Sequence, residues 1–388
     1  MYVPSPFEKQ LHTAMKVKDI TNLIEAYAPP AYQESYDNCG IQVGNHNDDV
    51  TGVLIALDVT EAILEEAINR GCNMVLTHHP LIFGGIKRLT GANYVERIVK
   101  MAIKNDICIY AAHTNMDNVK NGVNAKIAEK LGLTNVRILA PKENLLYKLY
   151  TYAPVPDANR VREALFAAGA GHISQYSECS FNSNGVGTFN SNGVGTFRGS
   201  ADTNPTIGVA GGPREEVQET KIEVIVGIHQ RQAVLQALKD NHPYEEVAYE
   251  LIALTNTATD VGAGMVGDLP EAMSETDALQ LIKYKMQAGC IRHTSLLGKP
   301  VRKIAVCGGS GSFLLRNAIG AGADMFVTAD YKYHQFFDAE QKIIIADIGH
   351  YESEQYTSEI FHAILTKKYP NFAILLSNLS TNPVKYFC

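Results

Sequence analysis

The stretch GVLIALDVTEAILEEAINRGCNMVLTHHP, residues 52–80, decides the fold class of this chain. It holds two short apolar runs, 52–58 and 73–77, on either side of the segment 61–69, whose apolar residues recur with helical spacing. A strand, a helix and a second strand in this order are typical of parallel strands joined by a crossover helix. We therefore predict an α/β protein.

The same alternation continues after this stretch and returns near the end of the chain. The pattern predicts a helix at 93–104, a strand at 107–112 and a helix at 122–131 that stops at Gly132. The last block predicts helices at 275–288, 312–320 and 352–367, and strands at 303–307, 324–328 and 342–347. We expect a two-lobed α/β domain with mainly parallel sheets, made of residues 15–142 and 257–388, after an unstructured leader of residues 1–14.

Residues 145–254 follow a different pattern and are predicted to form an inserted domain. The expected order is strand, helix, strand, strand, helix, strand, at 146–153, 157–168, 173–181, 221–228, 230–240 and 246–254. This βαββαβ order is that of the ferredoxin-like α+β arrangement. Inside the insertion FNSNGVGT occurs at 181–188 and again at 189–196, which we interpret as a local duplication that lengthens a hairpin arm.

The composition favours a globular protein of the cytoplasm. The 388 residues, 46% hydrophobic and 19% charged, are enough for two or three domains. A formal net charge of −7 makes nucleic acid a poor candidate partner, and no window approaches the roughly 18 apolar residues of a membrane span. No C-x-x-C pair occurs among the seven cysteines, which favours free thiols in a reducing compartment: Cys39, Cys72, Cys108, Cys179, Cys290, Cys307 and Cys388.

Possible metal ligands follow three of the predicted strands. His78 and His79 follow the strand 73–77, the strand 107–112 leads to His113 and Asp117, and the strand 342–347 leads to His350 and Glu354. In open α/β sheets, ligands bind in the crevice beyond the carboxyl ends of the strands, so we expect these groups to meet there.

The spacing of these residues is compatible with two neighbouring ions. Where a strand ends before Pro80, His78 and His79 can diverge toward different ions, while His350 and Glu354, four residues apart on a helix, share one face. A carboxylate such as that of Glu354 can bridge two metals. Imidazole and carboxylate ligands without thiolate suit zinc, iron or manganese alike.

Each signal also has an ordinary structural explanation. A histidine pair is more often structural than metal-binding, and Asp117 could cap a turn before residues 118–121. His350 and Glu354 could form a simple exposed pair one helical turn apart. The convergence of all three groups on strand ends is what favours a metal site.

Other segments could contribute to a pocket. GGSGS at 308–312 could cradle an anion or serve only as a tight strand–helix turn. Asp330, Lys332 and His334 could contact a substrate or cap a helix, and Lys87 with Arg88 could hold an anionic substrate or belong to a solvated loop. YDNCG at 36–40 could form a pocket rim or a plain turn.

Five motifs together resemble a known family. They are THHPLIFGG (77–85), AAHTNMDN (111–118), GGSGS (308–312), TADYKYH (328–334) and DIGHYESE (347–354). The chain resembles the dinuclear-metal-centre hexameric protein family, whose members are often labelled GTP cyclohydrolase I type two homologues. The likeness covers about 15–140 and 258–388, and HPYEEVAYELI at 242–252 resembles the CutA-like or PII-like module of longer bacterial members.

The resemblance implies a set of metal ligands and an oligomeric assembly. It implies that two divalent ions are held by His78, His79, Asp117, His350 and Glu354, with Glu354 bridging. It also implies a homohexameric ring, a trimer of dimers, whose metal sites face an internal cavity. Tyr36, where the family commonly has tryptophan, and Ala329, where a TGD motif is usual, are departures that concern the shape of the pocket.

Two functions follow as hypotheses. The first is a metal-dependent hydrolase acting on a nucleotide or a related small molecule, in which His113 orients a ligand or transfers a proton and Lys87, Asp330 and His334 contact the substrate. The second is a non-enzymatic metal-binding regulator or scaffold that uses the PII-like insertion. Because sites rather than folds decide chemistry, the family label alone does not choose between them.

Overall fold

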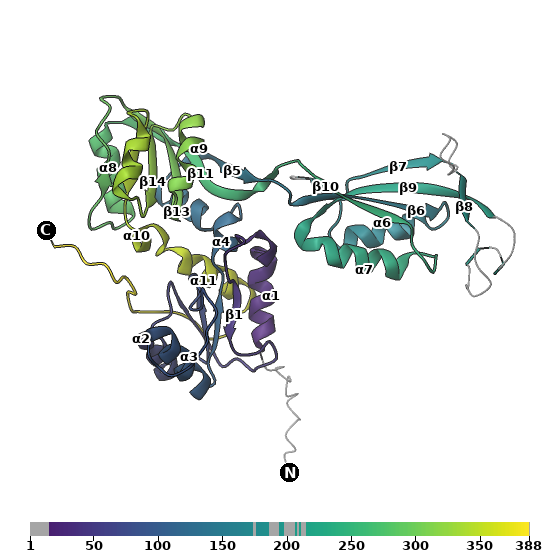
Figure 1. Ribbon diagram of the computed structural model, residues 1–388, viewed down its shortest axis with the longest axis horizontal. Coiled ribbons are helices and arrows are strands. Elements are labelled where there is room, and N and C mark those ends of the chain that lie inside the picture. The colour runs from purple at the N-terminus through teal and green to yellow at the C-terminus, as the bar shows by residue number, and fades with distance from the viewer. Residues whose placement is uncertain are drawn as a thin grey trace, which may run out of the picture. The chain divides into compact units, whose positions relative to one another are not determined.

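The computed structural model describes residues 15–173, 176–185, 194–197, 206–207, 209–210 and 215–387 (Figure 1). The expected leader, residues 1–14, lies outside this part. The chain divides into two compact units, with boundaries at Ala140/Pro141 and at Gly262/Ala263. The first and last parts of the chain form unit 1, and the middle part forms unit 2.

The first lobe of unit 1 is built on a five-stranded sheet. The strand order is β1 (Gly40–Val43), β4 (Cys108–Ala111), β3 (Met74–Thr77), β2 (Val53–Ala56) and β16 (Ile374–Leu376). The last four strands in this order run parallel, and β1 is antiparallel to β4. Every residue of β2, β3 and β4 is buried, as expected for parallel strands covered on both faces.

Helices cover both faces of this sheet. Alternate strand residues such as Leu54 and Val75 pack against α2 (Glu61–Asn69) and α3 (Tyr94–Lys104). Their neighbours Ile55 and Leu76 face the core that includes α1 (Val17–Tyr27) and α11 (Thr357–Lys368), and Figure 1 shows α1 and the α2–α3 pair on opposite sides. The Thr60 and Asn93 side chains cap α2 and α3 by accepting backbone N–H bonds.

The second lobe contains a six-stranded sheet. Its order is β12 (Arg292–His293), β15 (Ile344–Asp347), β14 (Met325–Ala329), β13 (Val301–Ser310), β11 (Ala258–Met273) and β5 (Thr134–Lys142). Strands β13, β14 and β15 are parallel, whereas β12 and β11 run antiparallel to β15 and β13. The helices of this lobe include α8 (Glu275–Lys285) and α9 (Leu315–Gly320).

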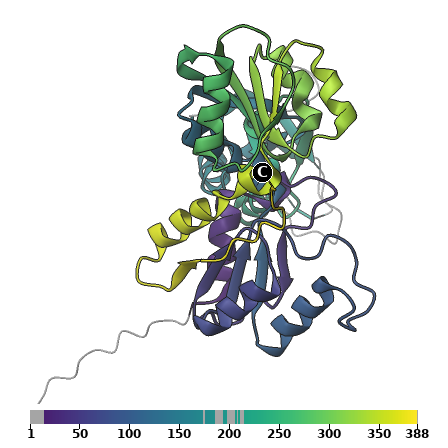
Figure 2. The same cartoon turned by 90° about the vertical axis from the view of Figure 1, so that its left-hand side faces the viewer.

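One hydrophobic core joins the two lobes of unit 1. It contains side chains of both sheets, together with α5 (Val123–Leu131), which ends where Gly132 adopts a left-handed conformation at φ 71°. Figure 2 shows the two sheets one above the other, with the C-terminal tail, in yellow, passing from the lower to the upper lobe. The carboxyl ends of β3, β4 and β15 therefore belong to one compact unit with a shared hydrophobic core.

Unit 2 is an antiparallel sheet with two helices. The strand order is β10 (Tyr249–Leu254), β6 (Leu146–Pro154), β9 (Glu215–Gly227) and β7 (Ser180–Gly185), and β8 (Val194–Phe197) also pairs with β9. Buried side chains of β6 and β9 pack against α6 (Ala158–Ala167) and α7 (Arg231–Asn241). The chain order of the four main strands and two helices is strand, helix, strand, strand, helix, strand.

The duplicated octapeptide lies across β7 and β8 in a single register. Gly185 of β7 is opposite Glu219 of β9, and Val194 of β8 is opposite the adjacent Gln218. The intervening residues, 186–193, are one repeat in length and lie outside the described residues. The second copy therefore continues the ladder at the position that Val186 of the first copy would occupy. Whether the duplication lengthens a hairpin arm falls on the undescribed residues.

The structure differs from the predicted elements in several places. The closing helix, expected at 352–367, is divided into α10 (His350–Glu354) and α11, and the strand expected at 173–181 begins only at Ser180. The α-helices and strands of the described residues that were not predicted from sequence are α1, α4 (Thr114–Asn118), β1, β5, β8, β11, β12 and β16. Strand β11 contains Gly262, Gly264, Gly267 and Pro270, which mask its strand pattern. Across the described ranges, no helix has the length and apolar character needed to cross a bilayer.

The register of β7 and β8 predicts that one repeat can be removed without harm. Deleting residues 186–193 would join Gly185 directly to Val194, restore consecutive pairing with β9 and remove a loop-closure cost of at most about 2 kcal/mol. We expect equal or higher stability in thermal and urea unfolding. Deleting only seven residues, 186–192, leaves one residue too many and forces a bulge or a slip, so it should be the less stable variant. An eight-residue deletion that destabilises more than the seven-residue one would contradict this register.

Candidate metal centre

A cavity of about 920 Å³ lies at the carboxyl ends of the strands of unit 1. The sequence-predicted residues in its lining are His79, His113, Asp117, Asp330, His350 and Glu354. His78, which is fully buried, lies directly behind them. Residues from positions 78 to 354 therefore meet at one place because both sheets direct their strand ends toward the same space.

Five side chains form two groups of donor atoms around Glu354. In the first group, Glu354 Oε2 lies 2.9 Å from His79 Nε2 and 3.1 Å from His350 Nε2, and the two nitrogens are 3.2 Å apart. In the second group, His78 Nε2 lies 3.6 Å from Asp117 Oδ1 and 3.8 Å from Glu354 Oε1. Each group could hold a metal ion, and Glu354 offers a different oxygen to each.

The imidazoles are oriented so that Nε2 faces the donor groups. Each ring donates its Nδ1–H to a fixed acceptor: His78 to Ala112 O at 2.9 Å, His79 to Asp58 Oδ1 at 2.7 Å, and His350 to Asp330 Oδ2 at 2.7 Å. A proton held on Nδ1 leaves the lone pair of Nε2 for a cation, and such outer partners are the usual support of metal-binding histidines. The donor set thus fits a divalent metal in its chemistry and its orientation.

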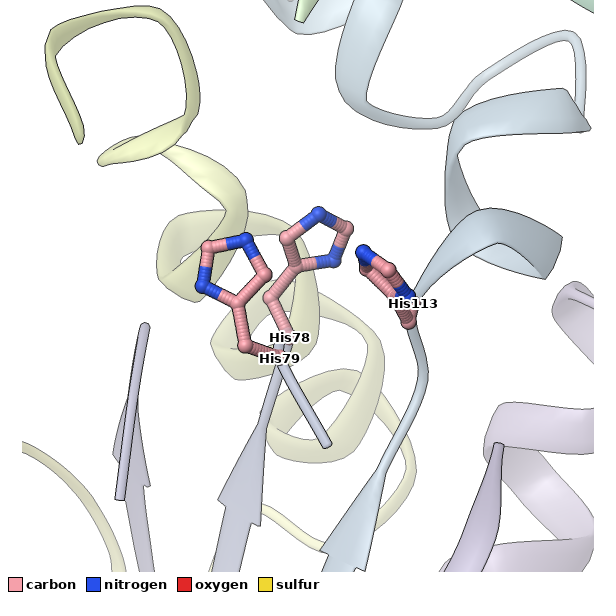
Figure 3. Close-up of side chains that lie close together, drawn as sticks. All are labelled: His78, His79 and His113. Carbon is pink, nitrogen blue, oxygen red and sulfur yellow. The ribbon is translucent and has the colours of Figure 1, made fainter. Parts of the chain in front are cut away.

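His113 is held in the same way beside this centre. Its Nδ1–H donates to Asp37 Oδ1 at 2.9 Å, and Asp37 Oδ2 accepts bonds from the Thr114 N–H at 2.9 Å and the Thr114 hydroxyl. Its ring centroid lies 5.2 Å from that of His78 and 5.4 Å from that of His79, and Figure 3 shows the three rings close together beyond the strand ends. These three histidines form a further group whose nitrogens could share an ion.

Three buried polar atoms of the centre have no hydrogen-bond partner in the described part of the chain: His78 Nε2, Asp117 Oδ1 and Glu354 Oε2. Leaving a buried donor or acceptor unpaired costs about 1–3 kcal/mol each. His78 Nε2 and Asp117 Oδ1 belong to the second donor group, and Glu354 Oε2 belongs to the first, so a cation in each group would satisfy all three.

The electrostatics of the centre demand positive charge. Burial alone would lower the pKa of His79 and His350, but Asp58, Asp330 and Glu354 raise these values to about 10 and about 11. Burial would also raise the pKa of Glu354, yet the neighbouring histidines hold it well below its usual value. Burial lowers the pKa of His78, which keeps that ring neutral. His79 and His350 are therefore protonated at neutral pH in the metal-free protein, and a metal ion can replace those protons.

The GGSGS segment supports Glu354, and two of its backbone N–H groups are bonded within the protein. The Gly308 N–H donates to Asn124 Oδ1 and the Gly309 N–H to Ser353 Oγ, both at 2.9 Å. Gly309 has φ 59°, and a Cβ atom there would overlap Glu354 Oε1. The glycines therefore let the backbone approach the shared carboxylate.

The remaining predicted site residues divide into two sets. Asp330 contacts His350 and also lines the cavity, where Tyr36 of the YDNCG segment joins it. Four other side chains are exposed and lie outside the lining: Lys87, Arg88, Lys332 and His334.

Sequence reasoning missed several supporting residues. Asp37 and Asp58 lie in turn-like segments with no spacing relationship to the histidines that they orient. The C-terminal tail was also missed: Thr381 donates its hydroxyl proton to Asp58 Oδ2 at 2.5 Å, and Asn382 Nδ2 donates to Glu352 Oε1 at 3.1 Å. The one available signal was that Asp58 lies two residues after the end of β2, near the strand end, as His78 lies at the end of β3.

Comparison with known proteins assigns the family. A family described as Duf34/NIF3 (NGG1p interacting factor 3) matches residues 15–383. The chain belongs to the Duf34/NIF3 family. It is 38% identical over 372 residues to a protein of Halalkalibacterium halodurans named GTP cyclohydrolase 1 type 2 homolog, covering 95% of this chain and 98% of that one. A Bacillus subtilis protein of the same name is 34% identical over 375 residues, again covering 95% and 98%.

A solved structure of another Duf34/NIF3 relative has the same fold. A Bacillus cereus protein related to NIF3 superposes with a TM-score of 0.81 at 37% identity, covering 96% of this chain and 99% of that chain. The resemblance inferred from the five sequence motifs is therefore confirmed at the level of the family.

Metal binding to this Duf34/NIF3 chain should release protons. The protonated forms of His79 and His350 stabilise the metal-free fold fully below the ordinary histidine pKa of 6.5, and this contribution is lost only as the pH rises through about 10 and 11. At neutral pH each ring must lose a proton to bind a cation, so the apparent metal affinity should fall from about pH 8 to about pH 6. Calorimetric titration with Mn²⁺ in buffers of different ionisation enthalpy counts the protons. An affinity that does not change with pH would contradict this description.

A side chain at Gly309 should damage the centre. We expect Gly309→Ala to lose about 1–3 kcal/mol of stability, because φ 59° is strained for alanine and the new methyl group displaces Glu354. Urea unfolding and metal content measured by atomic absorption test both effects. Gly320→Ala is the matched control, since its Cβ would meet no neighbour within 4 Å and it should be neutral or slightly stabilising. Equal stability and metal content for the two variants would refute the role of Gly309.

Proposed function

We propose that this protein is a dinuclear-metal-dependent hydrolase that acts on a nucleotide or a related small molecule. The observation that carries the proposal is the shared carboxylate: Glu354 presents Oε2 to His79 and His350 and Oε1 to the group of His78 and Asp117. Two-metal hydrolases use such a bridging acid to hold ions about 3.5–4 Å apart. Imidazole and carboxylate donors suit zinc, iron or manganese.

The side chains around the donor groups have distinct tasks in this proposal. Divalent ions bound there would supply Lewis-acid chemistry, polarising a substrate oxygen and lowering the pKa of a bound water toward neutrality. Asp58 and Asp330 fix the tautomers of His79 and His350 by accepting their Nδ1 protons. His113, fixed by Asp37, keeps Nε2 for a hydrogen bond to water or substrate, and we assign it to orientation or proton transfer.

The substrate class rests on two supports. The cavity of about 920 Å³ is within the size range of small-molecule sites. The curated relatives carry the name GTP cyclohydrolase 1 type 2 homolog, which suggests hydrolytic opening of a purine ring with release of formate. We retain Asp330, which lines the cavity, as a candidate substrate contact; Lys87 and His334 could serve only through movement or a neighbouring subunit.

A second candidate function is non-enzymatic. The strand order β10-β6-β9-β7 with two helices supports our proposal that unit 2 is a ferredoxin-like module of the CutA or PII type, and such modules serve sensing and assembly. The chain would then be a metal-binding regulator or scaffold, built as the homohexamer that the sequence resemblance implies. Six cysteines of the described residues are free thiols, which supports a reducing, cytoplasmic setting.

Steady-state turnover separates the two functions. We expect the Mn²⁺-loaded or Zn²⁺-loaded protein to release formate from GTP, and Glu354→Ala to lower that rate by roughly 100-fold or more, since even supporting residues of metal sites are worth 10–100-fold. Glu65→Ala, which changes an exposed helix carboxylate outside the cavity lining, is the control and should retain full activity. Equal and negligible rates for wild type and Glu354→Ala would reject GTP hydrolysis and leave the scaffold function.

A further inference from the structure

The cavity wall contains a single Lys or Arg side chain among the described residues, and it is Arg292. Its side chain is 57% exposed. Seven carboxylates share the same wall: Glu34, Asp58, Asp117, Asp330, Asp347, Glu352 and Glu354. An anion entering this acidic cavity therefore has one protein cation to bind, apart from the ions of the proposed metal centre.

Arg292 is fixed in place by its surroundings. It pairs with Asp347 across β12 and β15, and its Nη2 donates to Asp347 Oδ2 and, at 3.0 Å, to Tyr331 O. Asp347 is buried, and its Oδ1 accepts the Gly349 N–H at 3.2 Å, one residue before His350. Within the described part of the chain, Arg292 bonds through Nη2 alone, so the N–H groups of Nη1 and Nε are left for a ligand. A rigid guanidinium fork of this kind binds phosphate oxygens well.

An exposed aromatic ring of the first lobe lines the same cavity as Arg292. Phe83 is 58% exposed in the cavity wall, and its ring stands edge-on to His113 at 5.7 Å between centroids. Two further exposed aromatic side chains of the first lobe, Tyr36 and Tyr94, line the same cavity. Aromatic faces exposed in a concave site are typical of pockets that bind planar ligands.

Phe83 and Arg292 come from different lobes of unit 1, and both line the cavity that holds the donor groups. Phe83 contacts His113, whose ring lies 5.4 Å from that of His79, and His79 lies 5.1 Å from His350, ring centroid to ring centroid. In the second lobe, Arg292 bonds to Asp347, which accepts the N–H of Gly349, the residue before His350. The aromatic ring is therefore linked to the donor groups through His113, and the guanidinium is linked to them through Asp347 and Gly349.

We propose that Arg292 and Phe83 together select a phosphate ester of an aromatic group, with the phosphate on Arg292 and the ring against Phe83. The ligand then crosses the donor groups of His79 and His350. This inference rests on the proposed function in one respect, that metal ions occupy those groups. The inference adds the chemical class of the ligand, and it names Arg292 as the residue that selects a negatively charged ligand.

Calorimetric binding of phenyl phosphate to the Mn²⁺-loaded protein tests the proposal, with inorganic phosphate as the second probe. Arg292→Gln should weaken both probes tenfold or more, whereas Phe83→Leu should weaken phenyl phosphate alone. Arg292→Lys keeps the positive charge beside Asp347 but lacks the guanidinium fork, so it should weaken the binding of both probes by an intermediate amount. It serves as the second variant if removal of the charge in Arg292→Gln harms folding. Arg302→Gln and Phe337→Leu, exposed residues outside the cavity lining, are the matched controls and should bind like wild type.

The outcomes separate this inference from the proposed hydrolase. Tight, Arg292-dependent binding of phenyl phosphate, together with no formate release from GTP, would support the inference and reject GTP hydrolysis. Normal metal loading without phenyl phosphate binding, or equal binding by the Arg292 and control variants, would overturn the inference and leave the metal centre intact. Loss of binding to inorganic phosphate in Phe83→Leu would also overturn it, because the ring is assigned to the aromatic group alone.

Discussion

A buried carboxylate shared by two sets of imidazole and acid ligands is the constraint on which the rest of unit 1 depends. Glu354 is only 3% exposed, and its charge is tolerable there because His79 and His350 lie within about 3 Å of one oxygen. Burying an ion without such partners would cost several kcal/mol. The glycines at 308–309 and the short helix α10 have the geometry that this carboxylate requires.

The fold also has to bring residues that are distant in sequence to the centre with the correct orientation. Parallel strands bring their carboxyl ends to one edge, and residues just beyond β2, β3, β4, β14 and β15 provide Asp58, His78, His113, Asp330 and His350. The acceptors on Nδ1 then fix each ring. The sheets thus set the positions of these residues, and the acceptors bonded to Nδ1 set the tautomer of each histidine.

Sequence patterns predicted the donor residues better than their supports, for a physical reason. His78 directly follows a strand, and Asp117 and Glu354 lie in short helices that come soon after strands, so periodicity and the strand-end rule locate them. Asp37 acts only through a contact across 76 positions to His113, which leaves no local trace. Lys87, predicted from its place after the histidine pair, and His334, predicted from a strand end, lie outside the cavity lining, because closeness in sequence does not set the direction of a side chain. Strand β11 was missed since its glycines, needed for close packing of β5 at Gly267, resemble a loop.

The distribution of these residues along the chain has a consequence for biosynthesis. The donor set begins at His78 and is complete only with Glu354, and the tail residue Thr381 still has to reach Asp58. During translation the first lobe can therefore collapse around its own strands before the segment that contains Glu354 is synthesised. A nascent chain that stops before Glu354 has His78 and His79 without the carboxylate that joins the two donor groups, so both groups become complete only late in synthesis.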